Sequence, residues 1–123
     1  MAFISDNVFD SGLAYLTTNG GRLDICSQAP TTYAEATSTY TLGNKTSPTV
    51  GSPTNGASSG RRVIISAITD GTVTGTGTAT HWALTKTTAT TELLAWGTIT
   101  SQGVTSGNTF TLDALSITIP DAA

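Results

Sequence analysis

Two side chains in the sequence have the chemistry of a nucleophilic pair. Cys26 is the only cysteine and His81 is the only histidine, and a histidine base beside a thiol can generate a thiolate nucleophile. A single buried cysteine and a single histidine within a strand are, however, usually packing residues. A serine triad would also need His81, and no GxSxG elbow surrounds any serine. We therefore expect no enzyme and no catalytic residue.

The acidic residues and glycines likewise suggest no bound group. The eight carboxylates are scattered, and no pair has a spacing that compels a shared acid–base site. One cysteine cannot build a Cys-based zinc site or an intrachain disulfide. Gly71, Gly75 and Gly77 precede no helix and no Gly-Lys-Ser/Thr ending, so they do not form a phosphate loop. We expect no metal ligand and no cofactor-binding residue. The carboxylates are Asp6, Asp10, Asp24, Glu35, Asp70, Glu92, Asp113 and Asp121.

The surface is expected to be poor in charge. Charged residues make up 11% of the chain, against an average of roughly 25%, and threonine is the commonest residue. Hydroxyl groups must then hydrate most of the surface, which suits a protein that partners cover. The net charge is −3, and Arg61-Arg62 is the longest run among the cations. This argues against nucleic-acid binding, which depends on clustered Lys and Arg.

The start of the sequence has no basic n-region and no apolar h-region, so we expect no signal peptide. No stretch approaches the roughly 18 apolar residues that span a bilayer. The sequence predicts a protein that is made in the cytoplasm and has no membrane partner.

Residues 6–18 are predicted to form one amphipathic helix. Ser5 or Asp6 can cap it, and Asn19-Gly20-Gly21 supplies a stop. Asp6 and Asp10 suit the positive end of the helix dipole. Its apolar residues are Val8, Phe9, Leu13 and Leu16.

The next 40 residues are predicted to contain one strand and two irregular segments. Residues 22–27 alternate, with Leu23 and Ile25 on one face and Asp24 and Cys26 on the other, which indicates a strand. Residues 29–46 are read as a long excursion with one helical turn at 33–37. Residues 47–60 hold two prolines and several glycines, which is typical of an exposed loop.

The remainder of the chain is predicted to be strands. Residues 61–68 form a β-branched run, and Asp70-Gly71 is expected to turn it into a hairpin whose first arm is central and buried. From 72 to 80 threonine alternates with small residues, which predicts a strand with a hydroxyl face. That strand continues through residues 81–84, and 92–99 forms its neighbour. Trp82, Leu84, Leu94 and Trp96 are expected to face the core.

A parity flip near the C-terminus completes the predicted fold. Phe110 and Leu112 differ in parity from Leu115, Ile117 and Ile119, and a β-bulge at Asp113-Ala114 would restore one inward face. We expect residues 1–123 to form a single, mostly β domain. Its architecture is predicted to be an antiparallel β-sandwich or jelly-roll-like domain of about six to seven strands with one N-terminal helix.

Five segments carry a recognisable pattern of core residues: LDICSQAPTTYAEA (23–36), YTLG (40–43), ATHWAL (79–84), LLAWGTIT (93–100) and GNTFTLDALSITIPDA (107–122). They cover most of the chain after residue 22, and none is a chemical motif. In these segments the chain resembles a group of small virion proteins of tailed phages, encoded among head genes. The resemblance implies a capsid decoration or cement protein.

The same resemblance implies partners and a location. The partners would be the major capsid protein and neighbouring copies of the chain, and the location would be the capsid surface. Lysis releases phage proteins, so no export signal is needed. The N-terminal segment or the loop at 47–60 is expected to reach across capsid subunits. The alternative is a tail, fibre or adhesin component in which Trp82, Trp96 or tyrosines stack on host glycans, although core positions are favoured for both tryptophans.

Overall fold

A computed structural model describes residues 5–120. It contains one α-helix, one short π-helix and nine strands. The mostly β fold with one N-terminal helix is therefore confirmed, although residues 5–120 form nine strands rather than the six or seven expected. The elements are α1 (Asp6–Asn19), β1 (Arg22–Cys26), η1 (Glu35–Thr39), β2 (Thr41–Thr46), β3 (Thr54–Asn55), β4 (Arg61–Ile65), β5 (Ile68–Val73), β6 (Gly77–Lys86), β7 (Glu92–Val104), β8 (Thr109–Leu112) and β9 (Leu115–Ile119).

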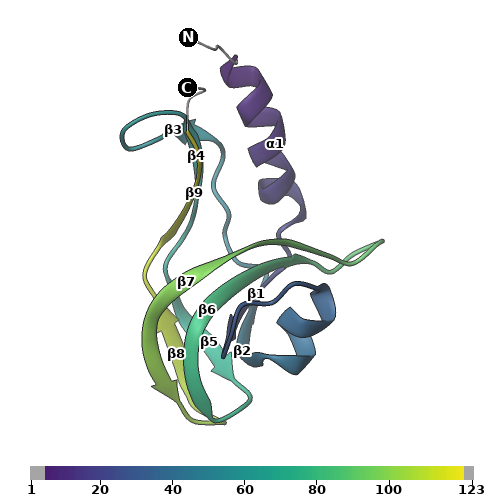
Figure 1. Ribbon diagram of the computed structural model, residues 1–123, viewed down its shortest axis with the longest axis vertical. Coiled ribbons are helices and arrows are strands. Elements are labelled where there is room, and N and C mark those ends of the chain that lie inside the picture. The colour runs from purple at the N-terminus through teal and green to yellow at the C-terminus, as the bar shows by residue number, and fades with distance from the viewer. Residues whose placement is uncertain (1–4, 121–123) are drawn as a thin grey trace.

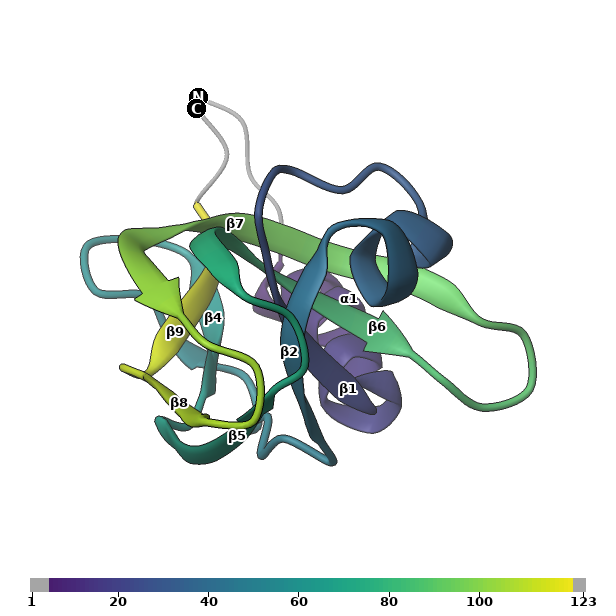
Figure 2. The same cartoon turned by 90° about the horizontal axis from the view of Figure 1, so that it is seen from below.

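The strands form two antiparallel sheets. Six strands, in the order β7-β6-β1-β2-β5-β8, make a strongly curled sheet, and a small sheet has the order β3-β4-β9. Figure 1 shows the small sheet with α1 beside it at one end of the molecule and the curled sheet at the other. From below, the curled sheet is seen to wrap around on itself (Figure 2). This arrangement is a sandwich-like β domain, as predicted.

One apolar cluster joins the two sheets. Its buried members come from the curled sheet and from β4, and Leu115 and Ile117 of β9 pack against it. Burial of apolar side chains is the main force that favours the folded state, so the cluster holds both sheets in one body. The fully buried members include Leu23, Ile25, Ile65 and Leu84.

Helix α1 forms where the sequence predicts it. The Ser5 side chain accepts a hydrogen bond from the Asn7 N–H at 3.1 Å, and Gly20 closes the last turn through its N–H to the Leu16 carbonyl. Phe9 and Leu13 are buried, as expected. Val8 is 62% exposed and does not join the apolar face.

The excursion at 29–46 contains more structure than its composition indicates. The helical turn begins at residue 33, as predicted, and continues through η1, but β2 was not predicted. This strand lies between β1 and β5 in the curled sheet, although its sequence is polar. A Cβ atom at Gly43 would lie 2.5 Å from the Thr72 carbonyl oxygen, so only glycine allows the close approach of β5.

The segment at 47–60 is mostly irregular, as predicted, but it is anchored to β4 and contains the short strand β3. The Gly51 N–H donates to the Ile64 carbonyl at 2.9 Å, and the Thr17 hydroxyl donates to the Gly51 carbonyl at 2.7 Å. Val50 bridges to Ile65, and β3 then pairs with β4. The exposed residues are 47, 49, 52, 54 and 55 together with the hairpin tip at 57–59.

The predicted turn at Asp70-Gly71 is also wrong. Strand β5 runs through both residues, and it belongs to the curled sheet, whereas β4 is the central strand of the small sheet. Gly71 lies opposite Phe110 of β8, and a Cβ atom there would lie 2.3 Å from the Phe110 ring. The glycine therefore makes room for a core aromatic ring rather than for a turn.

The threonine alternation at 72–80 spans two strands rather than one. β5 ends at Val73 and β6 begins at Gly77, so residues 74–76 form the connection. The parity is nevertheless preserved, because Thr72 and Thr78 are exposed while Val73 and Ala79 are buried. A period of two thus predicts the faces correctly but not the place where the chain turns.

The two tryptophans lie on opposite faces of the curled sheet, and a bulge in β7 explains why both were predicted on one face. Leu84 pairs with Ala95 and Thr85 pairs with Leu93, so Leu94 has no partner in β6. Leu94 and Ala95 both pack against the main core, and Trp96 therefore lies on the outer face. Core positions are confirmed for Trp82, Leu84 and Leu94, but the prediction is wrong for Trp96, which is 47% exposed.

The parity flip near the C-terminus comes from a corner rather than a bulge. Residues 113–114 leave β8, which pairs with β5, and lead into β9, which pairs with β4. The chain thus passes from the curled sheet to the small sheet at this point. Both segments present their apolar side chains to the shared core, as the flip in the sequence predicts.

Candidate interaction surface

The Cys26 thiol and the His81 imidazole lie on neighbouring strands. Cys26 of β1 is the register partner of His81 of β6. The thiol is fully buried and donates to the Ala36 carbonyl, with Sγ 3.6 Å from the oxygen. Burial, with the Asp24 carboxylate nearby, raises the pKa of the thiol to about 12. At neutral pH the sulfur is therefore protonated, and a thiol in this state is a poor nucleophile.

Asp24 is fully buried on the same side of β1, within a network of hydrogen bonds. Arg22 donates to both carboxylate oxygens, at 2.7 and 2.8 Å, and the Thr41 hydroxyl donates at 2.6 Å. Burial raises the pKa of the Asp24 carboxyl, and these hydrogen bonds offset only part of that rise. Every polar atom of the carboxylate is engaged, so the network fixes η1 and β2 against β1.

Three further carboxylates have separate local partners and do not share a site. Asp10 pairs with Arg61 at 2.7 Å, Asp70 pairs with Lys45 at 2.9 Å, and Glu35 accepts from Thr31. Asp10 therefore ties α1 to β4, a role that its place in the helix did not reveal. Among residues 5–120, no three His, Cys, Asp or Glu side chains are grouped as a metal site. Asp121 lies outside the described residues.

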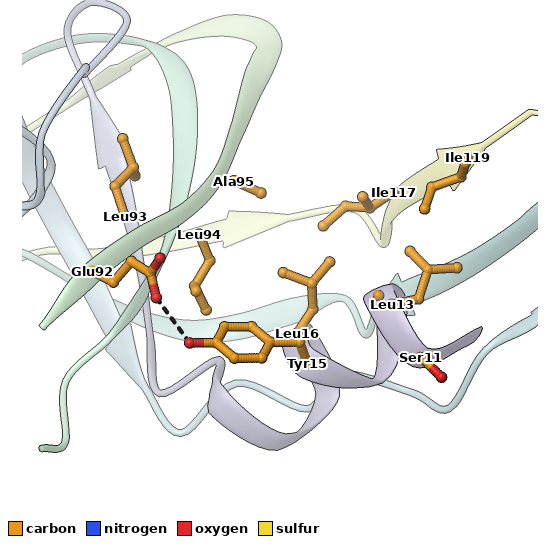
Figure 3. A pocket seen from close by; sticks show the side chains of 11 residues that line it. Ser11, Leu13, Tyr15, Leu16, Glu92, Leu93, Leu94, Ala95, Ile117 and Ile119 are labelled. Carbon is orange, nitrogen blue, oxygen red and sulfur yellow. Dashed lines mark hydrogen bonds between the residues drawn. The ribbon is translucent and has the colours of Figure 1, made fainter. Parts of the chain in front are cut away.

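An apolar groove of about 500 Å³ lies between α1, β7 and β9. Leu16 of the helix, Leu94 of β7 and Ile117 of β9 point toward one another across it (Figure 3). We call this feature the helix groove. Its lining consists of Ser11, Gly12, Leu13, Tyr15, Leu16, Glu92, Leu93, Leu94, Ala95, Ile117 and Ile119.

One end of the helix groove is polar. The Tyr15 hydroxyl donates to Glu92 at 2.9 Å, and the Lys86 ammonium lies 5.8 Å from the centre of the Tyr15 ring. Tyr15 is nevertheless 45% exposed, although it is a large aromatic side chain. An aromatic ring with a polar tip at the rim of an apolar groove is typical of a protein contact.

The opposite face of β7 carries a second exposed aromatic group. Trp96 lies 5.7 Å from the His81 ring, measured between ring centres, at an interplanar angle of 57°. The His81 Nδ1 is 2.8 Å from the Thr80 hydroxyl. This pair projects from the outer face of the curled sheet, whereas Tyr15 lies at the helix groove.

A smaller and more polar cavity of about 340 Å³ lies between the two outer strands of the curled sheet. The cavity is lined on one side by Thr98–Thr100 of β7 and on the other by Thr111–Asp113, at the end of β8. The Gln102 side chain donates to the Thr111 carbonyl at 3.3 Å. The curled sheet is thus nearly closed on itself, with a side chain bridging the two edges.

Apart from Tyr15, one of the tyrosines considered for glycan stacking, the sequence singled out no residue of the helix groove as a functional residue. Leu16, Leu94, Ile117 and Ile119 were predicted only as core positions, and each is part buried. The alternation of LSITI shows which residues face inward, but not that Ile117 and Ile119 line an open groove beside α1.

Comparisons with known proteins give no relative from which to transfer a function. No protein-family model, no curated protein and no solved structure matches the chain. Within residues 5–120, no helix has the length and apolar character needed to cross a membrane.

Proposed function

We propose that the chain is a structural protein of a tailed-phage virion, which decorates the capsid exterior and stabilises it through contacts with the major capsid protein. The observation that carries the proposal is the helix groove, an apolar cavity beside the exposed ring of Tyr15. Protein interfaces are depleted of charge at their centre and enriched in aromatic residues. The resemblance of the five sequence segments supplies the virion context.

The low charge of the whole chain supports the same proposal. With 11% charged residues, most of the surface can be covered without stripping water from many ionic groups, which is costly. A standard interface buries about 800 Å² on each partner. Neighbouring copies on a symmetric particle would supply further contacts of this kind.

The proposal is tested on particles assembled from the major capsid protein of the encoding phage. Purified chain is added to particles that lack it, and the copies bound per particle are counted by quantitative gel analysis and particle imaging. We expect Tyr15→Ser to lower occupancy at least about tenfold, since aromatic anchors can contribute 2 kcal/mol or more. The matched control is Trp96→Ser, which removes an equally exposed ring from the other face of β7.

Both variants are first checked by thermal unfolding, because only variants with an unchanged midpoint inform on binding. Full occupancy by a folded Tyr15→Ser chain would reject the helix groove as the capsid contact. Failure of the wild-type chain to bind particles at any concentration would reject the capsid role itself. Deletion of 47–60, which the sequence suggests as a test, would instead remove β3 and the Gly51 contact to β4.

The exposed Trp96 favours one alternative, a tail, fibre or adhesin component that binds host glycans. Aromatic faces stack on sugar rings, and Trp96 with His81 presents such a face. Under this alternative the two variants exchange roles: binding to a glycan array is lost in Trp96→Ser and kept in Tyr15→Ser. Trp82 is 6% exposed and is not available for such binding.

A further inference from the structure

The small sheet ends in an unprotected edge. β9 pairs with β4 on one side, and within residues 5–120 no strand pairs with it on the other. Unpaired edges invite other strands, and natural proteins usually protect them by shortness, charge or bulges. β3 has two residues and β8 has four, while β7 contains two register shifts. Among the described sheet edges, β9 combines five regular residues with no charged side chain, in the sequence LSITI. The other uncharged edge of comparable length, β8, is one residue shorter, and the Gln102 side chain already binds its Thr111 carbonyl.

The hydrogen bonds of β4 reveal which backbone groups of β9 are free. The Ile64 carbonyl accepts from the Gly51 N–H, so the backbone polar groups of Ile64 point away from β9. In an antiparallel pair the bonded residues alternate, and the bonded pairs are therefore Val63 with Ile117 and Ile65 with Leu115. It follows that the N–H and C=O groups of the intervening residues, Ser116 and Thr118, point to the free edge.

The helix groove lies over the inward face of the same strand. Leu115, Ile117 and Ile119 face inward, and the last two line the groove. Helix α1 packs mainly on β4 and leaves the β9 half of the face open. Leu94 of β7 forms the far wall (Figure 3). A free row of backbone groups and an open apolar groove thus occur side by side.

We propose that β9 accepts one extended segment of a partner protein as the fourth strand of the small sheet. The backbone of the segment pairs with Ser116 and Thr118, and every second side chain enters the helix groove. Strand addition to a sheet edge gives affinity through main-chain hydrogen bonds and specificity through side-chain pockets. The groove fits apolar or β-branched residues at these alternate positions, and proline is excluded where the segment must donate an N–H.

A single segment fits this site better than a second folded copy. A second copy would bring its own sheet and α1 to the same face, where β7 already stands as the far wall of the groove. An extended arm has no such bulk. The inference rests on the proposed function only for the origin of the arm, which would then be a segment of the major capsid protein.

The test uses a synthetic peptide that copies residues 60–66 of this chain, Gly-Arg-Arg-Val-Ile-Ile-Ser, because this sequence already pairs with β9 on its other side. Amide hydrogen exchange of the full chain is followed by NMR with and without peptide. We expect exchange at Ser116 and Thr118 to slow about tenfold when nine-tenths of the chain is bound. A peptide that merely displaced β4 would leave these two amides unprotected.

Two variants and one peptide serve as controls. Thr118→Pro removes an N–H that β4 does not use, so the chain should fold and the peptide should no longer protect Ser116. Ile119→Lys, which places a charge at the groove, tests the same point if the proline variant does not fold. Thr100→Lys places the same charge on β7 and should leave peptide protection unchanged. The peptide with proline in place of its second isoleucine should not bind.

Several outcomes would overturn the inference. These are peptide protection confined to β7 or β8, undiminished protection at Ser116 in a folded Ile119→Lys chain, or a dimer in sedimentation whose β9 amides are protected without peptide. The particle experiment separates this inference from the proposed function. Peptide binding at β9 without particle binding would retain the strand site and reject the capsid role, whereas full occupancy by a folded Thr118→Pro chain would retain the capsid role and reject the strand site.

Discussion

Cys26 shows how strongly a single side chain is controlled by its neighbours. Its thiol donates to the Ala36 carbonyl and lies in the same buried layer as the Asp24 carboxylate. Both surroundings favour the neutral form, because burial penalises a charged thiolate and a nearby carboxylate repels it. The residue that has the strongest nucleophile chemistry in the sequence is thereby held in its unreactive form.

We predict that the Cys26 thiol of the folded chain reacts with a disulfide reagent far more slowly than the same thiol in urea. At pH 8 the pKa of about 12 leaves almost no thiolate in the folded state. The measurement is the rate of release of the chromophore from the reagent with and without denaturant. Equal rates in a chain that is folded by circular dichroism would contradict the burial of the sulfur.

The same pKa predicts a loss of stability in alkali. The pKa is raised from 9.0 in the unfolded reference to about 12 in the fold, so the folded state holds the proton more tightly. This contribution is complete below pH 9 and is lost as the pH rises from there toward 12. Urea unfolding of the wild type and of Cys26→Ala measures it, because the alanine variant should show a smaller decline over this range.

At the scale of elements, the connections between strands decide which strands become neighbours. The corner at residues 113–114 and the β3–β4 hairpin bring β9 beside β4, and Gly60 lies where they meet. Gly60 has a φ of +73°, and a Cβ atom there would lie 1.9 Å from the Ile119 carbonyl oxygen. Both the left-handed backbone and the close approach require glycine.

We therefore predict that Gly60→Ala destabilises the chain by at least about 1 to 3 kcal/mol from the backbone conformation alone. The contact with Ile119 adds to that cost. The matched control is Gly103→Ala in β7, where nothing lies within 4 Å of the added Cβ, so that its change should stay within about 0.5 kcal/mol. Urea unfolding measures both variants, and equal stabilities would refute the role of Gly60.

The elements also show how far the sequence predicts this fold. Periodicity and capping residues are local signals, so α1, β1, β4 and the outward face of the alternating threonines at 72–80 follow from them. The turn at Asp70-Gly71 was wrong because the space that Gly71 provides is used by Phe110, which lies far away in the sequence. Trp96 was misplaced for a similar reason, since the unpaired Leu94 is defined only by the register with β6.

The candidate site was less predictable than the fold. Ile117 and Ile119 were expected to face inward, and they do. Their exposure to an open groove depends on the position of α1 over β4. That position is fixed partly by the ion pair between Asp10 of α1 and Arg61 of β4. No local pattern reports such a contact, because its two residues are far apart in the chain.

The whole molecule is predicted to unfold as one unit, because a single core serves both sheets. Ile65 of the small sheet and Trp82 of the curled sheet belong to the same buried cluster. Ile65→Ala should cost about 2 to 5 kcal/mol and should lower the unfolding midpoint reported by Trp82 and Trp96, which both lie in the other sheet. Far-ultraviolet circular dichroism and tryptophan fluorescence should give coincident transitions. Two separate transitions would contradict a single domain over residues 1–123, which stays a prediction until then.

The hairpin between β6 and β7 has a practical consequence. Residues 87–91 are all exposed, and the hairpin projects away from the rest of the chain (Figure 2). Exposed tips of this kind accept insertions readily. A short epitope or a fluorophore attached between Ala89 and Thr90 would therefore label the chain at the hairpin tip without interrupting β6 or β7, and its copies could be located by microscopy.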